Sequence, residues 1–408
     1  MNPPDEPPRN AHRLTAVVVN YRTGAFALSC VRSLRREWRA AGEAPGDLEV
    51  ILVDNASPID QRPWLDALAR EGVRVLASAS NGGYAAGVQM GLAASRQGGA
   101  DDYLALLHPD TVFLPGSVAT LIEHLELHPE CGAVAPRAFW DEDRYFRLAP
   151  PELPHLLGDV LDPLAEVWSP LARARDRRRT RARLASWEAR QPVRQSALSD
   201  ACLFLPRQLA SDLDPLLDPR YPLFFEGADL CRRLVARGLS LALHPGAEVL
   251  HHAGRSLGPE GALRGEAARR FEASRRAYRA HFFGGPARAL VQAAEEIRDK
   301  VRRRRPHGPA PIHDVVPLGR RDDRVELELE APGRVILELS RSPVFGQSAG
   351  ASVDAGAWRF PAAAWSWLYP GRWFLRALDP ESGRVLRAWS FQKTSAAREH
   401  PVELERAA

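Results

Sequence analysis

The sequence predicts an α/β domain with a mainly parallel sheet, followed by a small all-β domain. In the N-terminal part, short apolar runs alternate with segments of helical periodicity, which is typical of βαβ units. From about residue 315 the pattern changes to a strict alternation of apolar and polar residues, which is typical of antiparallel strands. The 408 residues suffice for one full α/β domain and a smaller second domain.

The predicted strands of the α/β domain are apolar and rich in β-branched residues, as expected of strands buried on both faces. They are 14–20, 48–53, 73–77 and 104–107. Helical periodicity predicts helices at 24–40, 64–71, 84–96 and 117–127. Strand patterns return at 198–206, 239–243 and 248–251, and a helix is predicted at 229–237 with Gly238 as its C-cap.

The chain is predicted to have five parts. They are a disordered tail at 1–13, the α/β domain at 14–285, a helix end with a basic linker at 286–314, a small β-sandwich-like domain at 315–395 and a tail at 396–408. Within the α/β domain, the Arg- and Pro-rich stretch 151–195 is predicted to be an insertion with one or two exposed helices. Its arginine run at 173–183 is expected to form a solvated helix face. The basic run at 302–305 is either a solvated helix end or a peripheral contact with the anionic inner face of a membrane.

The alternating segments near the C-terminus predict two β-hairpins. The first joins 325–330 to 334–339 across Ala331-Pro332-Gly333, and the second joins 373–378 to 385–391. The aromatic residues of this region are expected either in the core of the small domain or on a platform that stacks sugar rings. They are Trp365, Trp367, Tyr369 and Trp373.

Composition excludes several classes of function. A formal net charge of +4 gives little support to nucleic-acid binding. The four cysteines include no close pair, so neither a zinc knuckle nor a disulfide scaffold is expected, and most of them should be core residues. The polar N-terminus is not a signal peptide and no apolar run is long enough to span a bilayer, so we expect a cytoplasmic protein.

The strand predicted at 104–107 is followed by His108-Pro109-Asp110. Proline cannot continue the ladder, so the strand ends there and delivers Asp110 to the carboxyl edge of the sheet. That edge is where open α/β sheets bind ligands. A carboxylate at this place either holds a divalent cation that binds a diphosphate, or caps the helix predicted at 117–127.

Seven short motifs follow one another along the chain. They are V-V-V-N-Y (17–21), V-D-N-A-S (53–57), N-G-G-Y-A-A-G (81–87), L-L-H-P-D-T (106–111), S-D-A-C-L-F-L-P-R (199–207), F-F-E-G-A-D-L-C-R-R-L (224–234) and E-V-L-H-H-A-G-R-S (248–256). In this order the chain resembles the family 2 inverting glycosyltransferases of GT-A fold, especially their rhamnosyltransferase-like branch, over about residues 14–285. The resemblance does not extend to the C-terminal β domain.

The resemblance implies transfer of a sugar from a UDP-, dTDP- or GDP-linked donor to a glycan or lipid-linked acceptor in cell-surface polysaccharide synthesis. It implies a Mg²⁺ or Mn²⁺ ion bound by Asp110 and His251, with His108 at the place where the family usually has Asp or Asn. Implied contacts to the nucleotide sugar follow position by position. They are Asn20, Tyr21, Asp54, Asn81, Gly82, Gly83, His108, Asp200 and Arg255.

The general base is the position at which this chain departs from the family. An inverting transfer needs a carboxylate that deprotonates the acceptor hydroxyl. The resemblance places it after a glutamate, in the pattern E-D-x-D-L, but this chain has Gly227 there. Glu226 and Asp229 are the remaining candidates, and Asp229 is alternatively a helix cap. Two other functions stay open: a degenerate member that binds nucleotide or glycan without catalysis, and a scaffold whose β domain binds a glycan or a protein.

Overall fold

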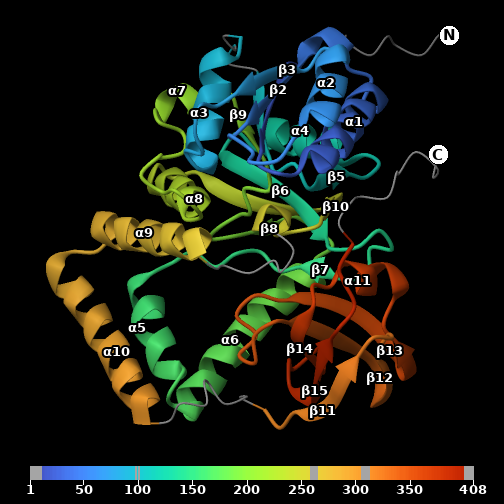
Figure 1. Cartoon of the computed structure of the whole chain (residues 1–408), viewed down its shortest axis with the longest axis vertical. Helices are drawn as coiled ribbons and strands as arrows, with labels where there is room; N and C mark the ends of the chain where they lie inside the picture. Colours follow the sequence, from blue (N-terminus) through green and yellow to red (C-terminus); the bar gives the residue numbers. More distant parts are fainter. Residues whose placement is uncertain (1–11, 97–98, 100–101, 258–264, 305–312, 399–408) are drawn as a thin grey trace.

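The computed structural model describes residues 12–96, 99, 102–257, 265–304 and 313–398 (Figure 1). Most of the two predicted tails and part of the predicted linker lie outside these residues. The chain forms a central mixed sheet with helices on its faces, and further strands at the C-terminal end extend the same sheet. The predicted α/β class is confirmed.

One half of the central sheet is parallel, in the order β4-β1-β2-β3. These strands are β1 (Leu14–Asn20), β2 (Leu48–Asp54), β3 (Arg74–Ala77) and β4 (Tyr103–Leu107). The helices around them are α1 (Gly24–Ala40), α2 (Arg62–Arg70), α3 (Tyr84–Ala94) and α4 (Ser117–Leu127). Apolar residues one turn apart on α1, such as Phe26, Cys30 and Leu34, are buried, and this explains why the periodicity located the helix.

The other half of the sheet mixes directions. Its strands are β5 (Thr111–Phe113), β6 (Cys131–Phe139), β9 (Cys202–Pro206) and β10 (Ser240–His251). Strand β9 runs antiparallel to β4 and β6, whereas β10 runs parallel to β6 and antiparallel to β5. The two short strands predicted at 239–243 and 248–251 are one strand, because β10 continues past an irregularity in its register between His244 and Glu248. Strand β6 was not predicted, although its first residues form an apolar run.

Shorter elements complete the α/β part. They are the 3-10 turns η1 (Pro45–Asp47) and η2 (Arg255–Leu257), the strands β7 (Arg147–Leu148) and β8 (Val193–Arg194), and the helices α7 (Leu209–Asp212) and α8 (Glu226–Ala236). Helix α8 is the helix predicted at 229–237, and Gly238 follows it with a φ of +81°. Glycine adopts this conformation without strain, as expected just past a helix end.

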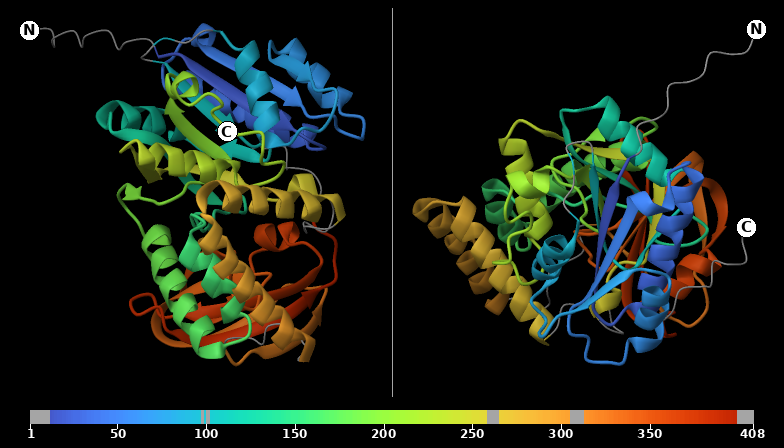
Figure 2. Two further views of the ribbon diagram at one scale, coloured as in Figure 1. Left: turned by 90° about the vertical axis from the view of Figure 1, so that its left-hand side faces the viewer. Right: turned by 90° about the horizontal axis from the view of Figure 1, so that it is seen from above.

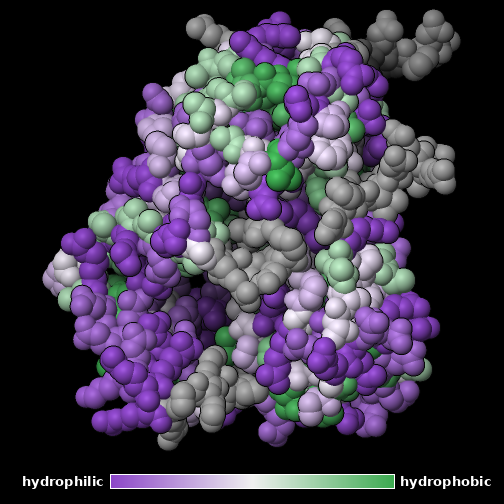
Figure 3. All heavy atoms as spheres, viewed as in Figure 1, coloured by the Kyte–Doolittle hydropathy of each residue, from purple (hydrophilic) through white to green (hydrophobic). Residues whose placement is uncertain are grey.

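The insertion forms two helices, as predicted. They are α5 (Leu156–Ala165) and α6 (Ser169–Trp187). Of two further helices, α9 (Gly265–Phe282) packs on the α/β part through its buried Tyr278, and α10 (Gly285–Arg304) packs against α5 (Figure 2). On the face drawn in Figure 3, hydrophilic side chains cover most of the surface over α5, α9 and α10. No helix among the described residues is long and apolar enough to cross a membrane.

The C-terminal strands follow one path of the sheet, β11-β15-β14-β12-β13, which joins the central sheet through β7. They are β11 (Val316–Arg321), β12 (Glu326–Ser340), β13 (Ala349–Arg359), β14 (Gly371–Leu378) and β15 (Val385–Lys393), with helix α11 (Ala362–Trp367) between β13 and β14. The hairpin predicted across 379–384 is confirmed, since β14 pairs antiparallel with β15.

The hairpin predicted across Ala331-Pro332-Gly333 is wrong. These residues lie within the single strand β12, which pairs with β13 and β14 on its two sides. The turn-forming residues instead produce a register shift between Leu329 and Arg334. A proline and a glycine are tolerated in a strand at such an irregularity.

Two expectations about side chains have different outcomes. The four aromatic residues at 365–373 are all buried, so they belong to the core and present no platform for a sugar. The arginine run of α6 is not simply a solvated face. Arg183 is buried and donates to Glu338 at 2.7 Å, which ties α6 to β12.

Candidate active site

Three chain segments meet at the carboxyl edge of the sheet and bring His108, Asp110 and His251 together. His108 and Asp110 flank the proline that ends β4, and a turn closed by Thr111 N and His108 O, 3.3 Å apart, starts β5. Strand β5 pairs with β10 so that Thr111 lies opposite His251. The pairing of two strands distant in sequence therefore completes the group that the sequence predicted.

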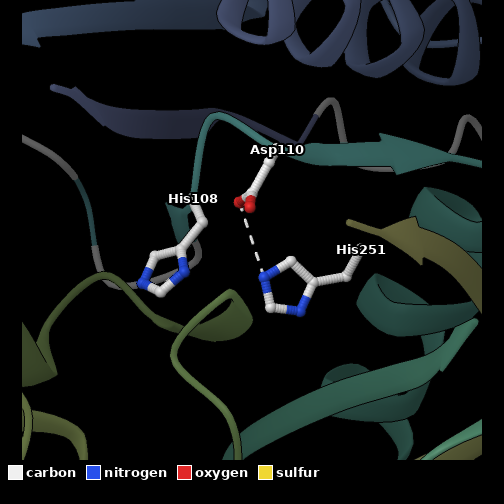
Figure 4. A group of neighbouring side chains, drawn as sticks. All are labelled: His108, Asp110 and His251. Carbon is white, nitrogen blue, oxygen red and sulfur yellow. Dashed lines mark ion pairs between the residues drawn. The ribbon is translucent and has the colours of Figure 1, made fainter. Parts of the chain in front are cut away.

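The geometry of this group suits a divalent cation. The potential ligand atoms of the three residues all lie within 4.8 Å of one another. His251 Nε2 is 3.5 Å from Asp110 Oδ1, and the rings of the two histidines are 5.7 Å apart (Figure 4). Two imidazole nitrogens and one carboxylate oxygen thus lie close enough together to share one cation, as part of a coordination shell.

Burial and charge favour the protonation states that a cation needs. Burial alone would raise the pKa of the Asp110 carboxyl, but the neighbouring His251 outweighs it and holds that pKa below the usual range. Burial lowers the pKa of His108, so its imidazole is neutral at pH 7 and offers a lone pair. The Nε2 atom of His251 is buried without a hydrogen-bond partner among the described residues, as expected of a ligand atom. The residues present therefore fit a metal ion.

The alternative role of Asp110 as a helix cap is wrong. Asp110 is followed by β5, and the N-cap of α4 is Gly116. The backbone of Asp110 is itself part of the sheet edge, because its carbonyl oxygen accepts from His252 N at 3.1 Å. The buried carboxylate lies beside the two histidines, and we call His108, Asp110 and His251 the histidine group.

The ends of β1 and β2 form the second part of the edge. Asn20 is fully buried, and its Nδ2 donates to Asp54 Oδ1 at 2.7 Å. Asp54 also accepts from Ser57 Oγ at 2.7 Å. Asn20 therefore orients Asp54 and has little freedom to contact a ligand itself, whereas Asp54 is half-buried and lies at the surface of the edge. Tyr21, also half-buried, follows directly.

The loop Asn81-Gly82-Gly83 is held by a residue that the motifs contained but that was not singled out. Asn55 is buried, donates to Asn81 Oδ1 at 3.1 Å and to Gly83 O at 3.0 Å, and accepts from Gly82 N at 3.2 Å. Arg270 of α9 reaches the same loop and donates to Asn81 Oδ1 at 3.1 Å. The signal for Asn55 was its place directly after Asp54 at a strand end.

Glycine is required at position 83 for reasons of space within the protein. Gly83 has a φ of +89°, and a Cβ atom there would lie 2.6 Å from the carbonyl oxygen of Pro222. The loop is thereby packed against the segment that leads into α8. The family resemblance implied that Gly83 contacts the nucleotide. In the structure, the space that this glycine leaves is taken by the backbone of Pro222.

Tyr84, the first residue of α3, was missed as a neighbour of the histidine group. Its ring contacts that of His108 edge-on, with centroids 4.8 Å apart. Its hydroxyl donates to the backbone oxygen of Asp200 at 3.2 Å. Tyr84 thus links the metal-ligand group to the turn that precedes β9, and the aromatic residue in N-G-G-Y was the available signal.

Three carboxylates lie around the amino end of α8. Asp229 is buried, and its oxygens accept from Arg233 Nε at 2.7 Å and Tyr221 Oη at 3.2 Å. Glu226 is also buried, and burial together with the charge of Asp200 raises its pKa well above the ordinary value. Asp200 lies in the turn before β9, 3.8 Å from His108 Nε2, with a side chain that is 21% exposed.

Arg255 does not point at the histidine group. Its guanidinium donates to three backbone oxygens, those of His252 at 3.0 Å, Trp367 at 3.1 Å and Arg398 at 3.2 Å. It also stacks over the rings of Trp367 and Tyr369, each 4.6 Å from the guanidinium carbon. Arg255 therefore joins η2 to the C-terminal part of the chain, and its predicted contact with the donor finds no support in this geometry.

Comparison with known proteins agrees with the motifs. Residues 15–183 match the family model described as Glycosyl transferase family 2. Two relatives from Mycobacterium tuberculosis, strains CDC 1551 / Oshkosh and ATCC 25618 / H37Rv, are each named N-acetylglucosaminyl-diphospho-decaprenol L-rhamnosyltransferase. Each is 29% identical over 255 residues, which cover 60% of this chain and 78% of the relative.

Solved structures of glycosyltransferases are also similar, at low identity. The crystal structure of GalNAc-T7 with UDP, GalNAc and Mn²⁺ matches with a TM-score of 0.41 and 18% identity, over 59% of this chain and 43% of that chain. The structure of S. aureus TarS 1-349 matches with a TM-score of 0.38 and 12% identity, over 67% of this chain and 72% of that chain.

Proposed function

Residues 15–183 of this chain form a glycosyl transferase family 2 domain, and from this premise we propose that the protein is an inverting, metal-dependent glycosyltransferase. Its donor is a nucleotide-diphosphate sugar with UDP, dTDP or GDP as the nucleotide. Its acceptor is a lipid-linked saccharide or a glycan of cell-surface polysaccharide synthesis. The choice of acceptor is supported by the names of the mycobacterial relatives.

The observation that most supports metal dependence is the group His108, Asp110 and His251, with its ionised carboxylate and a buried His251 Nε2 that makes no hydrogen bond within the described residues. These residues hold a Mn²⁺ or Mg²⁺ ion, and the two imidazoles favour Mn²⁺ because Mg²⁺ takes oxygen ligands. When bound, such an ion offsets the negative charge that builds on the leaving diphosphate.

The nucleotide half of the donor binds along the ends of β1 and β2. Asp54 is the ligand-facing group there, and its orientation is set by Asn20 and Ser57. The loop 81–83, fixed by Asn55 and Arg270, forms the adjacent wall. Because hydrogen bonds within the protein already hold Asp54 and the loop 81–83 in place, donor binding requires little further ordering of them.

A lipid-linked acceptor also gives a role to the basic end of α10. Its last turn contains Arg302, Arg303 and Arg304, of which the last two are exposed. Exposed arginines attract an anionic membrane surface at about 1 kcal/mol each. This turn is the part of the described chain that we assign to contact with the membrane that holds the acceptor.

Asp110→Asn provides the test. A unit charge 4 Å from another contributes on the order of 4 kcal/mol at an effective dielectric constant near 20, so loss of the carboxylate charge should weaken Mn²⁺ binding at least ~100-fold. Mn²⁺ affinity is measured by isothermal titration calorimetry. Sugar transfer is measured with a panel of UDP-, dTDP- and GDP-linked donors and a polyprenyl-diphosphate-linked saccharide acceptor, with Mn²⁺ or with EDTA.

Asp66→Asn is the matched control, because Asp66 is exposed on α2 and its loss removes the same charge. We expect this control to behave as wild type. Transfer that persists in EDTA, or an Asp110→Asn protein that binds Mn²⁺ as wild type does, would contradict metal dependence. A wild-type protein that transfers no sugar from any donor would contradict the proposed activity.

A further inference from the structure

The space beside the first turn of α8 is filled by the side chain of Asp200. A Cβ atom built on Gly227 would lie 2.8 Å from Asp200 Oδ2 and 3.0 Å from Asp200 Cγ. Separations under 3 Å between a Cβ and another heavy atom are essentially never seen, so a side chain at 227 would require the Asp200 carboxylate to move from this position. The Asp200 carboxylate thus occupies the volume that a side chain at 227 would otherwise enter.

The two other carboxylates at this helix end are unsuited to take a proton. Asp229 is 1% exposed and its charge is already used by Arg233, at 2.7 Å, and by the hydroxyl of Tyr221. Glu226 is 3% exposed, and burial raises its pKa well above the ordinary value, which favours its protonated form. A protonated carboxyl group cannot accept a second proton, and an ion-paired one in the core is not accessible to a sugar hydroxyl.

Asp200 has the properties that those two carboxylates lack. Its side chain is 21% exposed, and within the described residues no side chain donates a hydrogen bond to it. It faces His108 Nε2 at 3.8 Å, so it borders the metal-ligand group and hence the place proposed for the donor diphosphate. It also lies at the amino end of α8, where the helix dipole stabilises a negative charge.

We propose that Asp200 is the general base of the transfer, a role that rests on the proposed glycosyltransferase function. The acceptor oxygen forms a bond to the anomeric carbon while the bond from that carbon to the diphosphate oxygen breaks. The electron pair of the broken bond leaves with the nucleoside diphosphate. The acceptor's proton passes to the Asp200 carboxylate, so no other reactant is needed.

Asp200→Asn is the first test, because it keeps the shape of the side chain and removes its basicity. Loss of a general base typically costs 10²–10⁴-fold in rate, so kcat should fall by about that factor. Because the Asp200 carboxylate lies beside His108, loss of its charge should also weaken Mn²⁺ binding, so kcat is measured at saturating Mn²⁺ and donor. Asp66→Asn again controls for the loss of one surface charge, and Glu226→Gln should cost less than Asp200→Asn because Glu226 is buried and its raised pKa favours the neutral form.

The second test moves the carboxylate. The double variant Asp200→Gly with Gly227→Asp frees the space beside α8 and refills it from the helix side. We expect it to regain at least tenfold in kcat over Asp200→Gly alone, and thermal melts of all variants exclude misfolding as the cause of any loss. A structural or sugar-binding role of Asp200 would not be restored in this way.

The outcomes separate the two proposals. A wild type that transfers sugar while Asp200→Asn keeps kcat within about threefold overturns the base but not the activity. A loss confined to Mn²⁺ affinity or to the KM of the donor makes Asp200 a ligand and overturns its role as base. A double variant no more active than Asp200→Gly overturns the expectation that a carboxylate at position 227 can replace the one at position 200. A wild type that binds Mn²⁺ and UDP but transfers no sugar overturns both proposals.

Discussion

Arg376 of β14 is fully buried and ties the C-terminal strands to helix α6. Its guanidinium donates to Glu338 Oε2 at 2.7 Å, to Asp176 Oδ2 at 2.7 Å and to Thr180 Oγ1 at 2.9 Å. Asp176 and Thr180 belong to α6, whereas Glu338 belongs to β12. Replacement of Arg376 by methionine, which has a similar apolar volume, should therefore destabilise the protein through the carboxylates that remain.

The size of the effect follows from the contacts that survive. Glu338 keeps Arg183 at 2.7 Å and Ser348 at 2.6 Å, but Asp176 keeps only His313 at 3.1 Å. Removal of one partner of a buried ion pair costs about 3–5 kcal/mol. Burial would raise the pKa of Asp176, and His313 and Arg376 together hold it below the usual range. In the variant this pKa rises, so the deficit is largest at neutral pH and shrinks as pH falls and Asp176 becomes protonated.

Urea denaturation followed by tryptophan fluorescence measures this loss. Arg372→Met on the same strand is the control, because Arg372 is exposed and its loss should stay within about 0.5 kcal/mol. The double variant Arg376→Met with Asp176→Asn should recover part of the loss, since it removes the unpaired charge. A loss below about 1 kcal/mol in Arg376→Met, or a loss equal to that of Arg372→Met, would refute the reasoning.

Three further outcomes are expected. Gly83→Ala should lower the free energy of unfolding by about 1–3 kcal/mol and weaken nucleotide binding in calorimetry, because its Cβ would lie 2.6 Å from Pro222 O at a φ of +89°; an unchanged protein would contradict this. Asp229→Asn should lower stability by roughly 1.5–3 kcal/mol, since it weakens a charged hydrogen bond of 2.7 Å to the neighbouring arginine, while the KM for the acceptor stays near wild type. Burial lowers the pKa of His124 to about 4 and also lowers that of His244. Below about pH 6.5 the unfolded chain therefore binds more protons than the folded protein, and stability falls as pH falls towards about 4. The slope is up to about 1.4 kcal/mol per pH unit for each histidine. His124→Gln should flatten that slope in melts across this range, and an unchanged slope would count against it.

Local patterns predicted the parallel half of the fold well. The bounds of β1, α1 and α4 agree with the ranges predicted from apolar periodicity. The histidine group was also predicted, because Asp110 follows a strand that ends at the ligand-binding edge of the sheet and the family resemblance implied His251 beside it. The motifs located these residues along the chain, whereas the pairing of β5 with β10 brings them into contact.

Features that depend on distant partners were not predicted. Ala331-Pro332-Gly333 has the composition of a turn, yet β13 pairs with β12 both before and after these residues and keeps the strand extended. Arg255 follows the ligand strand closely enough to suggest a phosphate contact, but its donors are taken by Trp367 and Arg398, which lie outside the region of family resemblance. Local propensity is overridden wherever long-range pairing satisfies more backbone and side-chain donors.

The C-terminal part of the chain contacts the site through His252, the neighbour of His251. His252 directly follows the last residue of β10, and it is not part of the group His108, Asp110 and His251. His252 is buried and stacks on Trp367 with ring centroids 4.0 Å apart, and its backbone N–H donates to Asp110 O. Trp367 is anchored in turn by a 2.7 Å hydrogen bond to Glu142. Through these contacts, buried aromatic residues of the C-terminal part hold the end of β10, and with it His251, in place.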